Sequence, residues 1–281
     1  MIKVTKKMVL KALKNRRPDS HKGENGRVLV VGGSEEYAGA PLIAALAAKA
    51  VLRTGTDQSV LFAPEKVAWS ANAYSPDLIT YKTKGKFLAK KHAQQVIKMA
   101  KNFDCICIGN GIGLRKETRE FVKKAVNSTS IPKIVDADAI KALAGHRFKN
   151  DTIITPHLKE LEIFAQKRVQ RTGEEVKKIA QKHNCIVLLK GKTDIISDGQ
   201  KTFYNTTGNA GMTVGGTGDC LAGICAALVS HKNSLLESAC AGAYINGLVG
   251  DRLLKKKGFG FTATDIVEEI PYTVKSMKGM K

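Results

Sequence analysis

Hydrophobic residues along the chain fall into short unbroken runs, which alternate with longer stretches where apolar positions recur every three or four residues. The short runs, such as RVLVVGG at 27–33, indicate buried strands, and the longer stretches indicate helices. The predicted strands cover 27–33, 58–64, 104–111, 131–139, 152–157 and 185–191, and a predicted hairpin covers 194–205 with its turn at Asp198 and Gly199. The predicted helices cover 40–55, 87–102, 118–127 and 172–184, then about 217–230, 235–256 and 263–279.

This alternation predicts an α/β fold. Strands that are apolar along their whole length are buried on both faces, which is typical of a parallel sheet with helices on each side. In such sheets ligands bind beyond the carboxyl ends of the strands. Residues able to bind a ligand gather at those ends, namely Gly32, Gly33, Gly109 to Gly113, Asp136, Asp138, Pro156, His157, Lys190 and Gly191. We therefore expect a ligand site along this edge of the sheet.

The composition narrows the classes of function. A chain of 281 residues is long enough for one large α/β domain, and we expect a single domain over 1–281. The net charge of +21 favours anionic partners, although a solvated lysine-rich surface explains it equally well. Aromatic residues make up only 6%, without basic runs between them, which argues against single-stranded nucleic acid as a partner.

Two further sequence patterns bear on the cellular location of the protein. No stretch of about 18 uninterrupted apolar residues occurs, so we expect no membrane span. The six cysteines form no CxxC pair and no zinc-site spacing with histidine, which favours a reducing, cytoplasmic location over a disulfide scaffold.

The segment GNAGMTVGGTGDCLAG at 208–223 combines six glycines with one carboxylate, Asp219. The apolar, alanine-rich run that follows predicts a helix starting near Thr217. Backbone N–H groups at a helix start bind anions, and glycine lets a ligand approach the main chain closely. The segment therefore predicts either a phosphate cradle with an acid directed into it, or a turn in which Asp219 caps the helix.

Several polar residues also admit a structural interpretation. Asp136 and Asp138 either cap the helix that follows them or position a metal or substrate. His92, His183 and His231 lie in helical stretches, where we expect solvent-exposed side chains without a functional role.

GNAGMTVGGTGD resembles the anion-hole motif of the ribokinase-like superfamily. Within that superfamily the chain resembles the ADP/ATP-dependent NAD(P)H-hydrate dehydratases, from KGENGRVLVVGGSEEYAGA (22–40) through GNGIGL, IVDADAIKAL, TPHLKEL and LLKG to GNAGMTVGGTGDCLAG. The resemblance implies a ribokinase-like fold with a mainly parallel central sheet and helices on both faces. It also implies a lyase that uses ADP or ATP, with Mg²⁺, to phosphorylate the 6-hydroxyl of (6S)-NAD(P)H hydrate. Phosphate then leaves, which restores NADH or NADPH.

The same resemblance implies roles for individual residues. Asp219 is the base that takes the hydroxyl proton, kept ionised by its place at a helix start, and nearby N–H groups hold the transferring phosphoryl group. Residues implied at the substrate, besides Asp219, are Ala40, Gly111, Gly113, His157 and Glu160. Residues implied at the nucleotide are Lys190, Gly191, Lys192, Thr193, Asp194, Asn209, Ala210, Gly211, Met212, Thr213, Val214, Gly215, Gly216, Thr217 and Gly218. No protein ligand of the metal is assigned.

The chain departs from the family pattern at three places. The family usually has proline where this chain has Asn110, Pro-Gly where it has Leu158-Lys159, and threonine near the position of Asp194. The resemblance further implies a homo-oligomer, with a tetramer suspected. It also implies a separate NAD(P)H-hydrate epimerase as functional partner, because residues 1–26 are too short for a fused epimerase domain.

Two alternatives remain open at this point. A small-molecule kinase of the same superfamily, for hydroxymethylpyrimidine or a thiazole alcohol, uses the same GTGD motif, although GGSEEYAGA and TPHLKEL favour the dehydratase. A basic nucleic-acid-binding protein without catalysis is supported by the net charge alone.

Overall fold

The computed structural model describes residues 1–36 and 39–279, with residues 40–42 described by their backbone alone. Within these residues the strands are β1 (Ile2–Lys3), β2 (Arg27–Val31), β3 (Gln58–Pro64), β4 (Ile79–Thr83), β5 (Cys105–Ile108), β6 (Lys133–Val135), β7 (Thr152–Ile154), β8 (Ile186–Leu189), β9 (Asp194–Ser197) and β10 (Thr202–Asn205). The α-helices are α1 (Lys6–Ala12), α2 (Ala40–Arg53), α3 (Glu65–Tyr74), α4 (Ala93–Ala100), α5 (Lys116–Ser128), α6 (Asp138–Ala142), α7 (Leu158–Ala165), α8 (Gly173–His183), α9 (Thr217–Ser230), α10 (Leu235–Lys257) and α11 (Ala263–Lys278). Short 3₁₀ turns cover Lys90–His92, Ala210–Thr213 and Gly258–Gly260.

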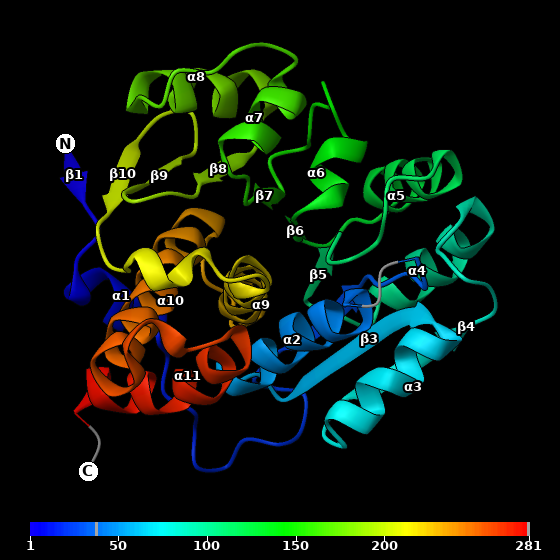
Figure 1. The fold of residues 1–281 in the computed structure, drawn as a ribbon, viewed down its shortest axis with the longest axis horizontal. Coiled ribbons are helices and arrows are strands. Elements are labelled where there is room, and N and C mark those ends of the chain that lie inside the picture. The colour runs from blue at the N-terminus through cyan, green and yellow to red at the C-terminus, as the bar shows by residue number, and fades with distance from the viewer. Residues whose placement is uncertain (37–38, 280–281) are drawn as a thin grey trace.

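The strands just named form one sheet in the order β1-β10-β9-β8-β7-β6-β5-β2-β3-β4 (Figure 1). Neighbouring strands are parallel, except that β9 is antiparallel to both β8 and β10. The chain places β3 and β4 on one side of β2 and then returns to place β5 on the other side. Ligands in open α/β sheets bind at such a reversal, beyond the carboxyl ends of the strands.

Helices cover both faces of this sheet. Val28 and Val30 of β2 point into a hydrophobic layer with α2, α3, α9, α10 and α11, while Leu29 and Val31 point into a layer with α4 to α8. Figure 1 shows α7 and α8 on one side of the strands and α9, α10 and α11 on the other. Burial on both faces explains why the central strands β2, β5 and β8 are almost entirely apolar, and it confirms the predicted fold class.

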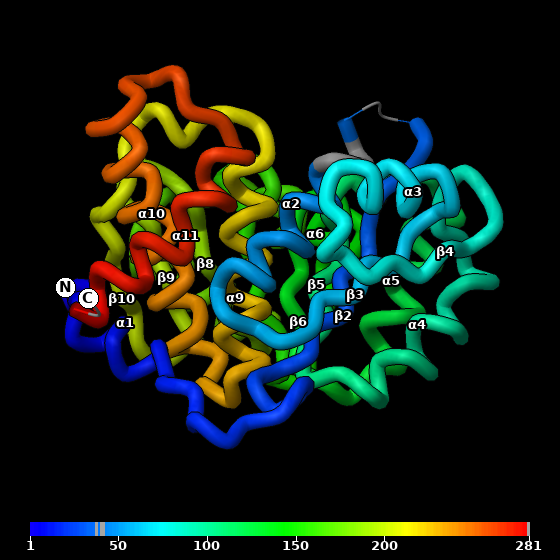
Figure 2. Tube along the Cα trace, turned by 90° about the horizontal axis from the view of Figure 1, so that it is seen from below, coloured from blue at the N-terminus to red at the C-terminus, as the bar shows by residue number. Residues whose placement is uncertain are grey.

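Helix α9 packs between α2 and α10 (Figure 2), and small residues allow the close approach. A Cβ on Gly223 of α9 would lie 2.3 Å from the carbonyl oxygen of Ala47 in α2, and one on Gly242 of α10 would lie 2.5 Å from Sγ of Cys225. Larger side chains cannot fit at these positions. The glycine- and alanine-rich sequence of α9 therefore serves packing, and this packing fixes where the helix begins.

The structure corrects several predictions from the sequence. The strand predicted at 131–139 is too long, because β6 ends at Val135 and α6 begins at Asp138. Helices α1, α3, α6 and α7 and the strands β1 and β4 were not predicted. His92 and His183 are buried rather than exposed, and His231 is half-buried.

Two expectations from composition can be compared with the structure. All six cysteines are buried free thiols. Within residues 1–36 and 39–279, no helix combines the length and the apolar character needed to cross a bilayer.

Candidate active site

The candidate site lies where the carboxyl ends of β5 and β6 meet the start of α9. The chain leaves β5 through Gly109, whose φ of 127° favours glycine, and a Cβ there would lie 2.0 Å from the carbonyl oxygen of Asp136. The next residue, Asn110, accepts a hydrogen bond on its carbonyl oxygen from the N–H of Gly33 at 2.8 Å, which joins this loop to the end of β2. The site therefore lies at the reversal in strand order.

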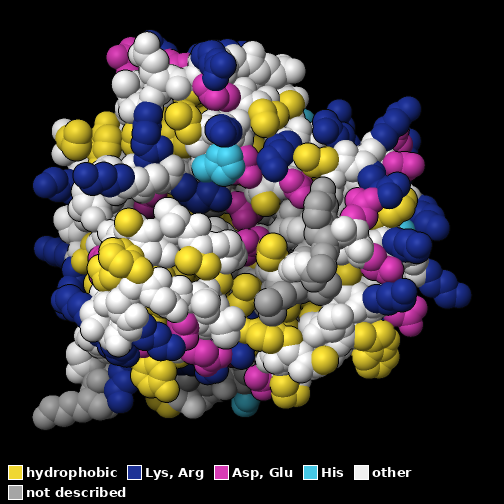
Figure 3. All heavy atoms as spheres, viewed as in Figure 1, with side chains coloured by type: hydrophobic (Ala, Val, Ile, Leu, Met, Phe, Trp, Pro, Cys, Tyr) yellow, Lys and Arg dark blue, Asp and Glu magenta, His cyan; other side chains and the backbone are white. Residues whose placement is uncertain are grey.

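A hydrogen-bond network joins residues from five parts of the chain. The amide nitrogen Nδ2 of Asn110 donates to Oδ1 of Asp219 at 2.7 Å and to Oδ2 of Asp136 at 3.1 Å. The other oxygen of Asp136 accepts from Oγ1 of Thr155 at 2.6 Å and from Nζ of Lys190 at 3.3 Å. Figure 3 shows acidic and basic side chains gathered near the middle of this face, beside a histidine. The network brings Asp219 and Lys190 together as expected, through two residues without an assigned role.

Burial and charge shift the pKa values of the two central residues. Burial and, second to it, the negative charge of Asp136 raise the pKa of Asp219 to about 7, against the opposing effects of Asn110 and Lys190. The expectation that the helix start keeps Asp219 fully ionised is therefore wrong. Burial alone would lower the pKa of Lys190, but Asp136, Glu160 and Asp219 together raise it above its ordinary value. Lys190 is thus a cation, and Asp219 is poised to exchange a proton near neutral pH.

The start of α9 has the backbone geometry that an anion cradle requires. Gly216 precedes the helix with a φ of 92°, and the hydroxyl of Thr217 donates to the carbonyl oxygen of Met212 at 2.8 Å. The first N–H groups of a helix have no acceptor within it and can bind an anion, although the N–H of Thr217 here makes a long hydrogen bond of 3.5 Å to the carbonyl oxygen of Val214. A Cβ on Gly218 would lie 3.1 Å from Nζ of Lys190, so the ammonium group lies directly beside the first turn. Helix start, ammonium group and carboxylate therefore converge on one place.

The loop at 190–194 adjoins this cradle. Gly191 donates its N–H to Oδ1 of Asp194 at 3.0 Å, and burial raises the pKa of Asp194. Arg171, which carried no signal in the sequence, donates to the carbonyl oxygens of Lys190 and Thr193. Lys192 is exposed. The loop conformation is thus held by hydrogen bonds within the protein, while its lysine side chain projects to solvent.

The segment before the cradle is held by a second residue that the sequence did not indicate. Asp251 of α10 accepts from the N–H of Gly208 at 3.0 Å and from Nδ2 of Asn209 at 3.1 Å. Oδ1 of Asn209 in turn accepts from the N–H of Gly211 at 2.9 Å. Ala210 to Thr213 form a 3₁₀ turn, and Val214 and Gly215 are exposed beside the cradle.

Residues implied at the substrate lie on the β6 and α7 side of the site. His157 and Glu160 form a reciprocal cap at the start of α7, in which each side chain accepts the other residue's N–H at 3.4 and 3.0 Å respectively. Glu160 is buried, with Oε1 3.9 Å from Nζ of Lys141, whereas the ring of His157 is exposed. Both residues therefore have a structural role in addition to the implied contact with substrate.

Two glycines in the loop after β5 adopt backbone conformations that favour glycine, with φ of 62° at Gly111 and 82° at Gly113. The N–H of Gly113 donates to Oδ2 of Asp138 at 3.1 Å, so the loop is tied to α6. Ala40 is the first residue of α2, but its side chain lies outside the described residues.

The family of the chain follows from comparison with known proteins. A family model described as NAD(P)H-hydrate dehydratase matches residues 28–272. The chain belongs to this family. Its members are lyases, and the match favours the dehydratase over the kinase alternative.

Individual relatives agree with this assignment. The chain is 36% identical to the ADP-dependent (S)-NAD(P)H-hydrate dehydratase of Cenarchaeum symbiosum, over 95% of this chain and 94% of that protein. It is 40% identical to the bifunctional NAD(P)H-hydrate repair enzyme of Pyrobaculum aerophilum, over 92% of this chain but only 52% of that protein. The chain thus spans about half the length of this and similar bifunctional relatives. The solved ADP/ATP-dependent NAD(P)H-hydrate dehydratase of Bacillus subtilis shares the fold, with a TM-score of 0.84, 23% identity and 98% of both chains covered.

The two acids after β6 have different roles in the structure. The carboxylate of Asp136 accepts from Asn110, Thr155 and Lys190, and α6 has no side-chain cap. The helix-cap interpretation of Asp136 is therefore wrong, and its role is to orient the polar groups of the site. Asp138 lies in the first turn of α6 and pairs with Lys141 at 2.9 Å.

The residues do not fit a metal ion held by the protein alone. Across the described part of the chain, no three His, Cys, Asp or Glu side chains come close enough together to hold a metal. Asp136 already accepts three hydrogen bonds, and the adjacent Lys190 cation opposes a second cation there. Mg²⁺ at phosphate sites is held largely by substrate phosphates and water. We therefore treat Mg²⁺ as part of the nucleotide substrate.

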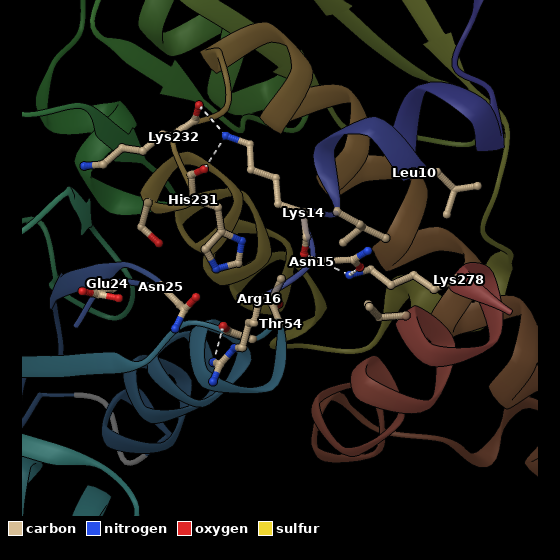
Figure 4. Close-up of a pocket in the computed structure, with 14 residues that line it drawn as sticks. Leu10, Lys14, Asn15, Arg16, Glu24, Asn25, Thr54, His231, Lys232 and Lys278 are labelled. Carbon is tan, nitrogen blue, oxygen red and sulfur yellow. Dashed lines mark hydrogen bonds between the residues drawn. The ribbon is translucent and has the colours of Figure 1, made fainter. Parts of the chain in front are cut away.

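A cavity of about 810 Å³ lies at the other end of α9 and contains none of the predicted site residues (Figure 4). Its cations are already bonded to the protein, since Nζ of Lys14 donates to the carbonyl oxygens of His231 and Lys232 at 2.8 and 3.1 Å. These carbonyl groups follow the carboxyl end of a helix, where the helix dipole disfavours anions. The basic residues there stabilise a helix end, and the cavity is separate from the candidate active site.

Proposed function

We propose that the chain catalyses the nucleotide-dependent dehydration of (6S)-NAD(P)H hydrate. The observation that carries this proposal is the convergence of the α9 start, Lys190 and Asp219, which supplies an anion cradle beside a base with a pKa of about 7. With ADP, the reaction converts the hydrate into NAD(P)H, AMP and phosphate. With ATP, the nucleotide product is ADP.

The start of α9, Lys190 and Asp219 each have a defined role in the proposed reaction. Asp219 takes the proton of the 6-hydroxyl as that oxygen bonds to the terminal phosphorus of the nucleotide. The N–H groups of Gly216, Thr217 and Gly218, with the ammonium group of Lys190, stabilise the charge on the transferring phosphoryl group. A Mg²⁺ ion brought by the nucleotide would be held by its phosphates and water rather than by these residues, and would neutralise phosphate charge. Phosphate then leaves with electrons supplied by the ring nitrogen, and loss of a ring proton restores the double bond.

The experiment incubates the chain with hydrated NADH, Mg²⁺ and either ADP or ATP, and follows recovery of the absorbance of the reduced ring. We expect recovery only with nucleotide, and we expect ADP to support turnover at least as well as ATP. Asp219→Asn retains the shape of the side chain but cannot accept the proton, so turnover should fall about 10²–10⁴-fold. Nucleotide consumption with a thiazole alcohol or hydroxymethylpyrimidine, without hydrate repair, would instead support the kinase.

The remaining proposals concern the setting of the enzyme. We propose that the chain forms a cytoplasmic homo-oligomer, and light scattering tests whether this oligomer is a tetramer. A second proposal is that the chain works together with an NAD(P)H-hydrate epimerase, and relatives about twice its length that are named as bifunctional repair enzymes support it. Addition of such an epimerase to a mixture of hydrate epimers should raise the yield of NADH from about the share of one epimer to nearly all of the substrate.

A further inference from the structure

The amide of Asn110 lies between the two carboxylates of the candidate active site. Its side chain is fully buried, and Nδ2 donates to Asp219 at 2.7 Å and to Asp136 at 3.1 Å. A side-chain amide nitrogen carries two hydrogens, so both donors are used. The reversed amide would point its oxygen at two carboxylates, so the network determines which way the side chain faces.

The backbone around Asn110 is held independently of this side chain. Its carbonyl oxygen accepts from Gly33 at 2.8 Å, and a Cβ on Gly32 would lie 2.3 Å from that oxygen. The positive φ values of Gly109 and Gly111 define the loop on either side. A substitution at 110 therefore tests the amide group rather than the course of the loop.

We propose that Asn110 is a positioning residue for the reaction proposed above: its amide holds one oxygen of Asp219 and leaves the other for the substrate hydroxyl. The same amide separates Asp219 from the like charge of Asp136. Without it, the two carboxylates would face each other with no donor between them, and Asp219 would hold a proton to a higher pH. The inference rests on the proposed function only where it names the substrate hydroxyl, because the hydrogen bonds of Asn110 are present in the structure itself.

The other groups that face Asp219 remain in place when the amide is removed. Asp136 follows β6 and Lys190 follows β8, and these two carry opposite charges. The nearby thiols do not bond to Asp219: Sγ of Cys107 donates to Oδ1 of Asn110 at 3.4 Å and Sγ of Cys220 donates to the carbonyl oxygen of Ala263 at 3.6 Å. Burial raises the pKa of both thiols well above the physiological range, so neither adds a charge beside Asp219. A change in the titration of Asp219 therefore reports on the amide.

The test compares Asn110→Leu, which retains volume but has no donor, with the wild type. Asn110→Ala, which adds no bulk, is made in parallel in case the leucine variant does not fold. Asn233→Leu is the matched control, because Nδ2 of Asn233 also donates twice, to the carbonyl oxygens of Ala12 and Leu228 at 2.9 and 2.8 Å, at the opposite end of α9.

The first readout is the titration of the Asp219 carboxyl carbon by ¹³C NMR in aspartate-labelled protein, assigned with Asp219→Asn. We expect its midpoint to rise by about 1–2 pH units in the Asn110 variants, as the loss of a hydrogen bond to a charged group implies. The Asn233 control should titrate like the wild type. An unchanged midpoint in the Asn110 variants would overturn the inference.

The second readout is the pH profile of kcat/KM for hydrated NADH. In the Asn110 variants, the midpoint of the fall in kcat/KM on the acidic side of the profile should shift to higher pH by the same amount. Activity that is lost at pH 7 should therefore return at higher pH. A uniform loss with an unmoved midpoint would indicate only a structural role and would also overturn the inference. If the wild-type chain does not repair the hydrate at all, the proposed function fails, while the NMR titration still decides the role of Asn110.

Discussion

Replacement of Asp219 by asparagine should stabilise the folded protein while it removes activity. The folded chain raises the pKa of Asp219 from the ordinary 3.8 to about 7, so the ionised carboxylate is less stable in the folded protein than in the unfolded chain. A difference of about three pH units corresponds to about 4 kcal/mol. Because the asparagine oxygen can still accept from Asn110, the variant avoids this cost, and we expect a gain of about 2–4 kcal/mol at pH 8.

The stability difference between Asp219→Asn and the wild type should depend on pH. Between about pH 4 and 7 the folded wild type binds more protons at Asp219 than the unfolded chain, so its free energy of unfolding falls as pH rises through this window. The asparagine variant lacks this dependence. Its advantage should therefore be small near pH 4, grow up to pH 7 and then remain constant.

The assay is urea and thermal unfolding of both proteins at pH 5 and pH 8, where the gain at pH 8 should raise Tm by roughly 5–10 °C. Asp265→Asn is the control, because Asp265 also lies in the first turn of a helix but has a lowered pKa, and burial there is outweighed by its bonds to Lys257 and Thr262. That variant should lose stability at pH 8 and regain it toward acidic pH. The reasoning fails if Asp219→Asn is less stable than wild type at pH 8, or if its advantage is the same at both pH values.

Three further substitutions test the surroundings of Asp219. Lys190→Met leaves Asp136 without its cation, 3.3 Å away, and should cost up to about 3 kcal/mol in urea unfolding together with a weaker nucleotide affinity by calorimetry. Gly216→Ala forces a side chain onto a φ of 92° and places its Cβ 2.8 Å from that of Ala263, so unfolding should show a loss of at least about 1–3 kcal/mol. Gly218→Ala lies in a helix and should fold normally, within about 1 kcal/mol of wild type, yet slow hydrate repair because its Cβ comes within 3.1 Å of Nζ of Lys190. Unchanged turnover in that last variant would remove the lysine from the proposed cradle.

The central part of the fold was predictable because its residues are buried on both sides. Strand β5 is apolar at every position and β2 is apolar after Arg27, so these strands can be recognised without knowing which strands lie beside them. Strand β4 was missed because it lies at the edge of the sheet, where Ile79 and Tyr81 are exposed and polar residues alternate with them. A single domain over 1–281 stays a prediction.

The candidate site was predictable in its backbone but not in its hydrogen bonds. The glycine-rich segment indicates a helix start with Asp219 in its first turn, and both features are present. Asn110 and Asp136 meet Asp219 only because β5 and β6 are neighbours in the sheet, and strand order is not visible in a hydrophobic pattern. Arg171 and Asp251 form hydrogen bonds with backbone groups that are distant in the sequence, and no local sequence motif predicts such contacts.

The reactivity of the six buried thiols can be used to measure local opening of the folded chain. They are distributed over the centre of the molecule, at Cys105 and Cys107 in β5, Cys185 before β8, Cys220 and Cys225 in α9 and Cys240 in α10. Alkylating reagents attack the thiolate form of cysteine. In the closed protein each of these thiols is buried, so reagents cannot reach it. Burial also raises its pKa, so little of it is ionised. The rate at which each thiol is alkylated then measures how often its own segment opens, and mass spectrometry of the labelled peptides would map breathing motions strand by strand without any introduced probe.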